Sequence, residues 1–340
     1  MSSQLSDGKK TSAHPVVTPG SPGGKGRQRL RTVEEIALRF SMIWVLIAVI
    51  ILARAYYPGF FEYGNIKNLL SQNAALGMVA LAMTFVIICG GFDLSVGGTV
   101  VLASVLYAGF SNDHSLMVAF LMTLAIGLFV GLFNAIAVTV LKVNAFVATL
   151  ASSSLVTAAA LIYSDSGPVA SRNPKFNEFG TGDLLGVPKV GWVLIITFVL
   201  GALVLARSVY GRSIYAVGGN YEAARLAGIR ANLVRGSTYL LTGAAAATAG
   251  VMLASRTGIG QPQVVGDFTL GSIAIVIIGG TSLLGGEGAL WRTGIGLLIV
   301  ATLRNLFDSL ALGSDVQMLV EGTIVLLAVA LDSYTRRRRT

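Results

Sequence analysis

Long stretches of apolar residues without a charged side chain recur along the chain. The stretches 40–53, 69–92 and 115–141 contain no Asp, Glu, Lys or Arg. Because an α-helix needs about 20 residues to cross the ~30 Å hydrocarbon core of a bilayer, such stretches predict membrane-spanning helices. The pattern predicts about ten of them, at residues 39–56, 69–90, 94–110, 116–141, 144–163, 191–207, 236–255, 270–284, 292–309 and 316–333. The predicted fold class is therefore an all-α integral membrane protein.

The composition agrees with this interpretation and excludes an ordinary cytosolic enzyme. Of the 340 residues, 54% are hydrophobic and 12% are charged, and the mean hydropathy is +0.74. Soluble domains carry about 25% charged residues. A chain with so few charges lacks the polar surface that a soluble enzyme presents to water.

The net charge of +9 on its own would fit a nucleic-acid-binding protein. The distribution of the charge argues against it, because most of the 25 basic residues fall at the two ends of the chain and in the segment 208–235. Basic residues concentrate on the cytoplasmic side of membrane proteins. The pattern therefore predicts that both termini are cytoplasmic, and no nucleic-acid partner is expected.

Three segments outside the predicted spans, 1–31, 164–190 and 336–340, have a distinct composition. Residues 1–31 are rich in Ser, Gly, Pro and Lys, which predicts a disordered basic cytoplasmic tail. Residues 32–335 form the transmembrane domain, and 336–340 form a short basic C-terminal tail. The longest outer loop, 164–190, contains several Gly and Pro residues, and both an ordered surface cap and a plain connector fit its sequence.

The longest inner loop, 208–235, contains a helix signal. Its string YEAARLAG is made of helix-forming residues, lies after a Gly-Gly-Asn sequence and ends at Gly228. A helix of this length is too polar to cross the membrane and too short to be stable alone. We therefore expect it to dock on another structure.

Two glycine-rich strings interrupt the apolar pattern, at 88–98 and 278–288. Each has a glycine pair, an insert containing Leu and Ser, and a second glycine pair. Glycine lets helices pack closely or lets the backbone unwind at membrane depth. Tight packing explains either string alone, whereas interrupted segments in corresponding positions of two halves point to a transport path.

Asp93 lies within the first glycine string. An uncompensated carboxylate at this depth costs at least about 2.5–3.5 kcal/mol. The favoured interpretation is structural: Asp93 caps the helix that begins near Leu94 by accepting its free amide hydrogens. A direct role in a transport path is the alternative.

Several chemistries are excluded by the residues that they need. The single cysteine, Cys89, allows no intrachain disulfide, and His14 and His114 do not have the spacing of a zinc hydrolase. The chain has no GxxxxGK[ST] string, so it is not itself a P-loop ATPase. No catalytic residue, metal site or cofactor is predicted in this chain.

The strings GGFDLSVGG (90–98), GGNYEAARLAGI (218–229), IIGGTSLLGGEG (277–288) and VLLAVALD (325–332) carry a family resemblance. At these residues the chain resembles the permease subunits of bacterial ABC importers for monosaccharides, of the ribose, xylose and galactose type, within the superfamily of branched-chain amino acid permeases. The resemblance covers about residues 35–335.

The resemblance implies a bundle like that of type II importers in the bacterial inner membrane, with a second permease copy or a sister permease beside it in the lipid bilayer. It also implies cytoplasmic ABC ATPase subunits, which bind ATP and Mg, and a periplasmic sugar-binding protein. The residues that match the ATPase-coupling segment are Glu222, Ala223, Ala224, Arg225, Leu226, Ala227 and Gly228. Candidates for the translocation path are Thr84, Gly91, Asp93, Ser95, Asn134, Thr149, Gly280, Thr281 and Ser282.

Three other functions compete with sugar import. The nearest alternative is a permease of the same architecture that carries branched-chain amino acids or nucleosides. An ion-coupled secondary transporter would work without an ATPase. A scaffold or receptor subunit would explain the spans and the loop helix, but it gives no reason for the paired glycine strings.

Overall fold

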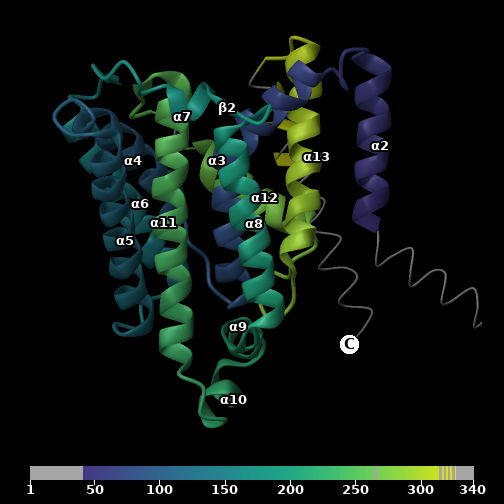
Figure 1. Cartoon of the computed structure of the whole chain (residues 1–340). Coiled ribbons are helices and arrows are strands. Elements are labelled where there is room, and N and C mark those ends of the chain that lie inside the picture. Colours follow the sequence, from purple (N-terminus) through teal and green to yellow (C-terminus); the bar gives the residue numbers. More distant parts are fainter. Residues whose placement is uncertain are drawn as a thin grey trace, which may run out of the picture. The chain divides into compact units, whose positions relative to one another are not determined.

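The computed structural model describes residues 41–263 and 266–313, together with 316, 317, 319, 320, 322, 323 and 326. The predicted tails 1–31 and 336–340, and most of the predicted span 316–333, lie outside these residues. The helices are α2 (Ser41–Tyr56), α3 (Tyr63–Ile88), α4 (Val96–Phe110), α5 (Leu116–Thr139), α6 (Ala145–Tyr163), α7 (Glu178–Thr181), α8 (Lys189–Arg207), α9 (Val209–Gly219), α10 (Tyr221–Leu226), α11 (Ala231–Thr257), α12 (Gly266–Ile278) and α13 (Leu290–Ser309) (Figure 1). Within the described residues four two-residue strands accompany them: β1 (Val169–Ala170), β2 (Asp183–Leu184), β3 (Val187–Pro188) and β4 (Ile259–Gly260).

The prediction of a mostly helical chain is confirmed. Among the described residues, five helices are long and apolar enough to cross a membrane, namely α3, α5, α6, α8 and α11. The apolar helices α2, α4 and α12 are shorter. Helix α13 has 20 residues, but it contains Arg292, Arg304 and Asp308 and is not among the five.

Helices α4 and α12 are too short to span a bilayer by themselves. They contain 15 and 13 residues, which corresponds to about 20 Å of helix against a core of ~30 Å. The predicted span 270–284 is corrected here: its helix begins at Gly266 and ends at Ile278. The reason is Gly280, whose φ of +78° ends the helix inside the second glycine string.

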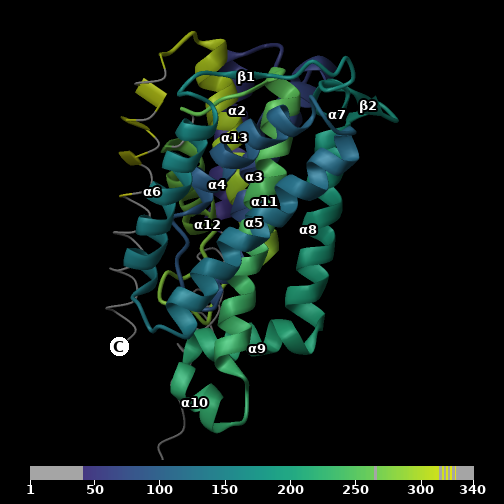
Figure 2. The same ribbon diagram turned by 90° about the vertical axis from the view of Figure 1, so that its left-hand side faces the viewer.

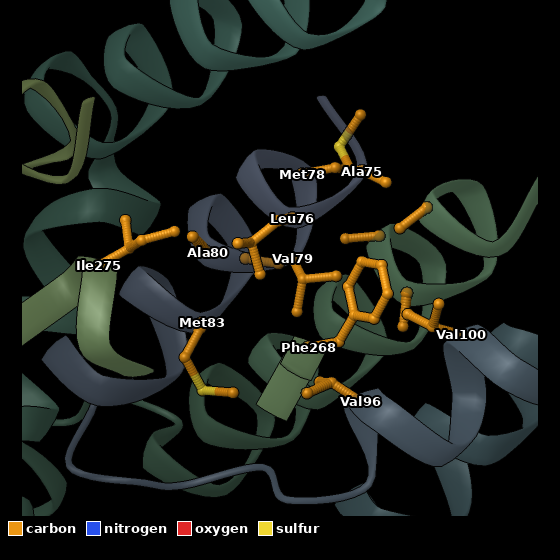
Figure 3. Close-up of a cluster of buried hydrophobic side chains, with 14 of the residues drawn as sticks. Ala75, Leu76, Met78, Val79, Ala80, Met83, Val96, Val100, Phe268 and Ile275 are labelled. Carbon is orange, nitrogen blue, oxygen red and sulfur yellow. The ribbon is translucent and has the colours of Figure 1, made fainter. Parts of the chain in front are cut away.

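Helix α3 lies inside the bundle, and α5, α6 and α8 lie at its outside. Of the most apolar 18 residues in each helix, 89% are buried in α3, but only 28%, 28% and 22% in α5, α6 and α8. Figure 3 shows the core around α3, where Val79 and Met83 belong to one cluster of buried side chains with Val100 of α4 and Phe268 of α12. The exposed apolar faces of the outer helices suit lipid as their surroundings.

Helices α5 and α11 approach each other backbone to backbone, and Figure 2 shows them side by side. A Cβ atom added at Gly131 would lie 2.4 Å from the carbonyl oxygen of Tyr239, and one at Gly243 would lie 2.2 Å from that of Gly127. Small residues at such contacts let membrane helices pack closely. The packing interpretation of glycine therefore holds for this helix pair.

Alanine at Gly131 is expected to lower the free energy of unfolding by about 1–3 kcal/mol, because overpacked cores lose this much when the backbone must shift. The matched control is Gly236→Ala in α11, where the nearest atom to the added Cβ is 3.5 Å away. Thermal unfolding in detergent measures both. Equal unfolding temperatures for the two variants would contradict the close-packing interpretation.

The segment 164–190 is folded onto one end of the bundle. Strand β1 pairs antiparallel with β4, and β2 pairs with β3. Phe176 is buried, and its ring stacks on Tyr107 at a centroid distance of 5.0 Å. The backbone N–H of Gly180 donates to Ser255 Oγ at 2.9 Å. Of the two interpretations that the sequence left open, the structure has the ordered cap.

Candidate functional site

Helices α9 and α10 lie at the end of the bundle opposite to α7, at the bottom of Figure 1. The side chain of Asn220 begins α10 by accepting the Ala223 N–H at 2.9 Å. Gly228 ends it with a φ of +85°, and the Ile229 N–H donates back to the Ala224 carbonyl at 3.0 Å. The predicted start and stop of this helix are both confirmed. Because α11 begins at Ala231, the last residues of the predicted loop 208–235 belong to that helix.

The seven residues that match the coupling segment form a protruding surface. Ala224 is buried, whereas the other six are exposed. Leu226 is the one large apolar side chain among these seven residues, and it is 80% exposed. Glu222 and Arg225 form an exposed ion pair at 2.9 Å. We call this surface, residues 221–228, the α10 tip.

Helix α9, which the sequence did not predict, connects the α10 tip to the bundle. Its apolar side chains Ile214 and Val217 are buried, at 0% and 2% exposure. The hydroxyl of Tyr215 donates to the Gly288 carbonyl at 2.8 Å. Burial raises the pKa of the Tyr215 hydroxyl above its ordinary value, so the hydroxyl keeps its proton as a donor.

The last turn of α9 meets both glycine strings. The Gly286 N–H donates to the Ile88 carbonyl at 2.8 Å. A Cβ atom at Gly218 would lie 1.7 Å from that carbonyl oxygen, and one at Gly285 would lie 2.8 Å from the Gly218 carbonyl oxygen. We call this contact of Ile88, Gly90, Gly218, Gly285 and Gly286 the glycine junction.

The two glycine strings begin with the same helix stop. After α3, Gly90 has a φ of +76°, and the Gly91 N–H donates to the Val86 carbonyl at 2.9 Å. After α12, the residue with positive φ is Gly280, and the next amide donates to the Val276 carbonyl at 3.2 Å. This is the hydrogen-bonding pattern of a glycine C-cap. The recurrence that is visible in the sequence therefore reflects two equivalent helix ends.

Asp93 is the centre of a buried polar cluster. Its Oδ1 atom accepts the Ser95 N–H at 3.0 Å and the Ser95 hydroxyl at 2.6 Å, and its Oδ2 atom accepts the Thr242 hydroxyl. Asn134 Nδ2 donates to Ser95 Oγ at 2.7 Å. Since Thr242 lies near the middle of the 27-residue helix α11, the cluster lies well inside the bundle.

Two threonines connect this cluster to further helices. Thr149 Oγ1 of α6 accepts the Leu94 N–H at 3.0 Å, and Thr269 Oγ1 of α12 accepts the Gly97 N–H at 3.1 Å. These bonds satisfy amides at the start of α4 that have no partner within the helix. The polar cluster thus consists of side chains from α5, α6, α11 and α12 around the N-terminus of α4.

Four of the nine candidates for the translocation path come together in this cluster: Asp93, Ser95, Asn134 and Thr149. The other five lie elsewhere. Thr84 is buried between α3 and α13, where its hydroxyl is 2.8 Å from that of Thr293. Gly91 is buried against Tyr239, and Thr281 and Ser282 are buried in the second glycine string, whereas Gly280 is exposed.

Residues 65–329 match the family described as "Branched-chain amino acid transport system / permease component". The chain belongs to this family. The ribose import permease protein RbsC of Bacillus subtilis (strain 168) is 38% identical over 290 residues, which cover 84% of this chain and 90% of the relative. The RbsC protein of Escherichia coli (strain K12) is 35% identical over 85% of this chain and 91% of its own length.

Permeases named for another pentose are also similar. The L-arabinose transport system permease protein AraH of Escherichia coli (strain K12) is 34% identical over 308 residues, 88% of this chain and 94% of the relative. No solved structure matches the chain. The relatives confirm the resemblance to monosaccharide permeases, and together with the apolar helices they make the chain a multi-pass membrane permease.

Sequence reasoning missed several residues that the structure brings to these sites. Thr242 donates its hydroxyl hydrogen to Asp93, and Thr269 accepts the Gly97 N–H at the start of α4. An isolated threonine in an apolar helix gives no local signal of such a contact. Gly218 lay within the string GGNYEAARLAGI, but its contact with Ile88 comes from a distant part of the chain. The steric demand at Gly218 becomes visible only in the folded backbone.

Proposed function

We propose that this permease is the membrane-spanning subunit of an ABC importer that carries a monosaccharide across the bacterial inner membrane. The single observation that carries the proposal is the identity of 34–38% to permeases named for ribose and L-arabinose along most of their length. The chain itself is a transport subunit, and ATP hydrolysis belongs to partner subunits.

The topology that we propose has ten spans and cytoplasmic termini, with the α10 tip on the cytoplasmic side and the cap 164–190 in the periplasm. The short helices α4 and α12 are counted among the ten because a short helix can take part in a span where neighbouring protein covers the backbone that continues it. Basic side chains near the α10 tip support this orientation, because such residues favour the cytoplasmic face. They are Lys142, Arg207, Arg212, Arg225 and Arg230. The tails 1–31 and 336–340 are basic and belong on the same side.

The partners follow from this orientation. A pair of ATPase subunits, which bind ATP and Mg, docks on the α10 tip, and a sugar-binding protein delivers its ligand at the cap end. A second permease copy or a sister permease completes the central path. This chain holds no cofactor. The capped, protruding helix α10 with its exposed Leu226 supports the cytoplasmic contact.

The path residues remain those named from the sequence, with the Asp93 cluster as their centre. In the proposed cycle, ATP-driven closure of the ATPase subunits moves the α10 tip, and the bundle rocks between outward-open and inward-open states. The eight buried candidates would then line the path only in another state of this cycle. Their hydroxyl and amide groups suit weak, transient contacts with a sugar.

The cargo distinguishes this function from its nearest alternative. The family description names branched-chain amino acids, and a free amino acid brings a carboxylate that pairs best with a cationic group. The Asp93 cluster offers hydroxyls, an amide and a carboxylate. None of these groups is a cation that could pair with the carboxylate of an amino acid, and their hydroxyl and amide groups suit a neutral polyol, which supports a sugar as the cargo.

Co-purification and uptake test the proposal together. The tagged permease is expected to retrieve an ABC ATPase subunit, and proteoliposomes that contain both proteins and a sugar-binding protein should accumulate labelled ribose or arabinose only with ATP. Labelled leucine and adenosine serve as competing cargoes. Uptake by the permease alone under a sodium or proton gradient would instead support a secondary transporter and overturn the proposal.

A further inference from the structure

Any movement of the α10 tip reaches the bundle through two short connections. At its C-terminal side α10 continues into α11, and at its N-terminal side it follows the last turn of α9 with only Asn220 between them. Helix α9 is anchored by buried Ile214 and Val217. The end of α9 that lies next to α10 is the end that contains Gly218.

The contact at Gly218 is made by backbone alone. A Cβ atom there would lie 1.7 Å from the Ile88 carbonyl oxygen and 2.8 Å from the Gly286 nitrogen, two atoms that are hydrogen-bonded to each other. A side chain at an interface can change its rotamer when a neighbour moves, whereas a close-packed backbone cannot. Since packed interiors transmit strain, a displacement of α9 is passed on to both partners of this hydrogen bond.

From the glycine junction the chain leads to both short helices. On one side, residues after Gly90 lead directly to Asp93 and the start of α4. On the other side, Gly286 belongs to the string that connects α12 to α13. The starts of α4 and α12 are also connected directly, because the Gly97 N–H of α4 donates to Thr269 Oγ1 of α12.

Two side chains hold the glycine strings against α9 and α11. Arg235 Nη2 of α11 donates to the Gly90 carbonyl at 3.0 Å, and the Tyr215 hydroxyl of α9 donates to the Gly288 carbonyl at 2.8 Å. Each helix that leaves the α10 tip therefore has its own hydrogen bond to a different glycine string.

We propose that Gly218 and Gly286, pressed against the Ile88 carbonyl, are positioning residues of the transport cycle: they transmit the movement of the α10 tip to the short helices α4 and α12. This inference rests on the proposed function and adds the route inside the permease. The glycine pairs are required there because only a residue without a side chain lets three backbone segments meet.

Alanine at Gly218 tests the route, and Gly219→Ala is its matched control. Both residues lie in the last turn of α9, but a Cβ atom at Gly219 has no atom within 4 Å. The complex of permease, ATPase and sugar-binding protein is reconstituted, and ATPase capture, ATP hydrolysis and sugar uptake are measured. Gly218→Ala is expected to retain capture and hydrolysis and to lower the sugar transported per ATP by about tenfold. Gly219→Ala should match the wild type.

Tyr215→Phe gives an independent second variant, since it removes one hydroxyl and adds no volume. It should lower the sugar transported per ATP by about threefold, while ATPase capture and ATP hydrolysis are retained. Wild-type coupling in both Gly218→Ala and Tyr215→Phe would overturn the inference, as would an equal loss in Gly219→Ala or a loss of ATPase capture in Gly218→Ala. Failure of the proposed function would be recognised separately, because the wild-type permease would then show no ATP-dependent uptake.

Discussion

Glutamate in place of Leu226 is expected to weaken the binding of the ATPase subunits by at least about 30-fold, because the loss of an apolar anchor at an interface costs about 2 kcal/mol or more. Leu226 is 80% exposed at the end of a six-residue helix, so its side chain contributes little to the fold of this chain. Glutamate is a good helix former. The substitution thus changes the surface of the α10 tip and leaves its backbone conformation intact.

A pull-down of the ATPase subunit at several concentrations measures this effect. Leu185→Glu is the matched control: Leu185 is 88% exposed in the turn between β2 and β3, in the cap at the opposite end of the bundle. It should retain full capture of the ATPase. If Leu226→Glu captured the ATPase as well as Leu185→Glu does, the α10 tip would not be the docking surface, and the coupling role of residues 222–228 would have to be abandoned.

Local sequence was sufficient to predict α10 but not the helix that carries it. The start and stop of α10 follow from Asn220 and Gly228, whose roles depend only on their neighbours in the sequence. Helix α9 contains three glycines in eleven residues and resembles a loop. It is helical because Ile214 and Val217 are buried against other helices, and such tertiary contacts do not appear in a local pattern.

The role of the glycine strings was only partly predictable for the same reason. Their repetition is visible in the sequence, and the two helix ends at Gly90 and Gly280 explain it. The junction with Gly218 depends on three segments that are far apart in the chain. No spacing within any one of them indicates that Gly286 donates to the Ile88 carbonyl.

Asp93 shows how far a single residue can be interpreted from sequence. Its expected role as an acceptor of free amide hydrogens agrees with its bond to the Ser95 N–H, although α4 begins at Val96, later than the sequence suggested. The carboxylate lies just before the helix cap rather than at it. The second acceptor contact, to Thr242, required knowledge of which helix packs beside this turn.

Alanine at Asp93 is expected to lower the free energy of unfolding by about 2–6 kcal/mol, because two buried donors are left without an acceptor and each costs about 1–3 kcal/mol. The Ser95 N–H and the Ser95 hydroxyl would both lose their acceptor. The Thr242 hydroxyl is less affected, since the Tyr239 carbonyl lies 2.9 Å away and can accept its hydrogen. Thermal unfolding in detergent measures the loss. Thr123→Ala, a buried hydroxyl bonded only within its own helix, is the control for deleting a polar group.

Asparagine at Asp93 separates the structural role from a direct role in transport. Its Oδ1 atom can accept both hydrogens from Ser95, and its Nδ2 group can donate to Thr242 Oγ1, whose own hydrogen then goes to the Tyr239 carbonyl. Every hydrogen bond of the cluster therefore has a replacement, so the unfolding temperature and ATP-dependent sugar uptake should both stay close to wild type. If Asp93→Asn kept its stability but lost uptake, the carboxylate itself would act in transport. The charge or proton of Asp93, and not its geometry as an acceptor, would then explain why an acidic residue lies at this depth.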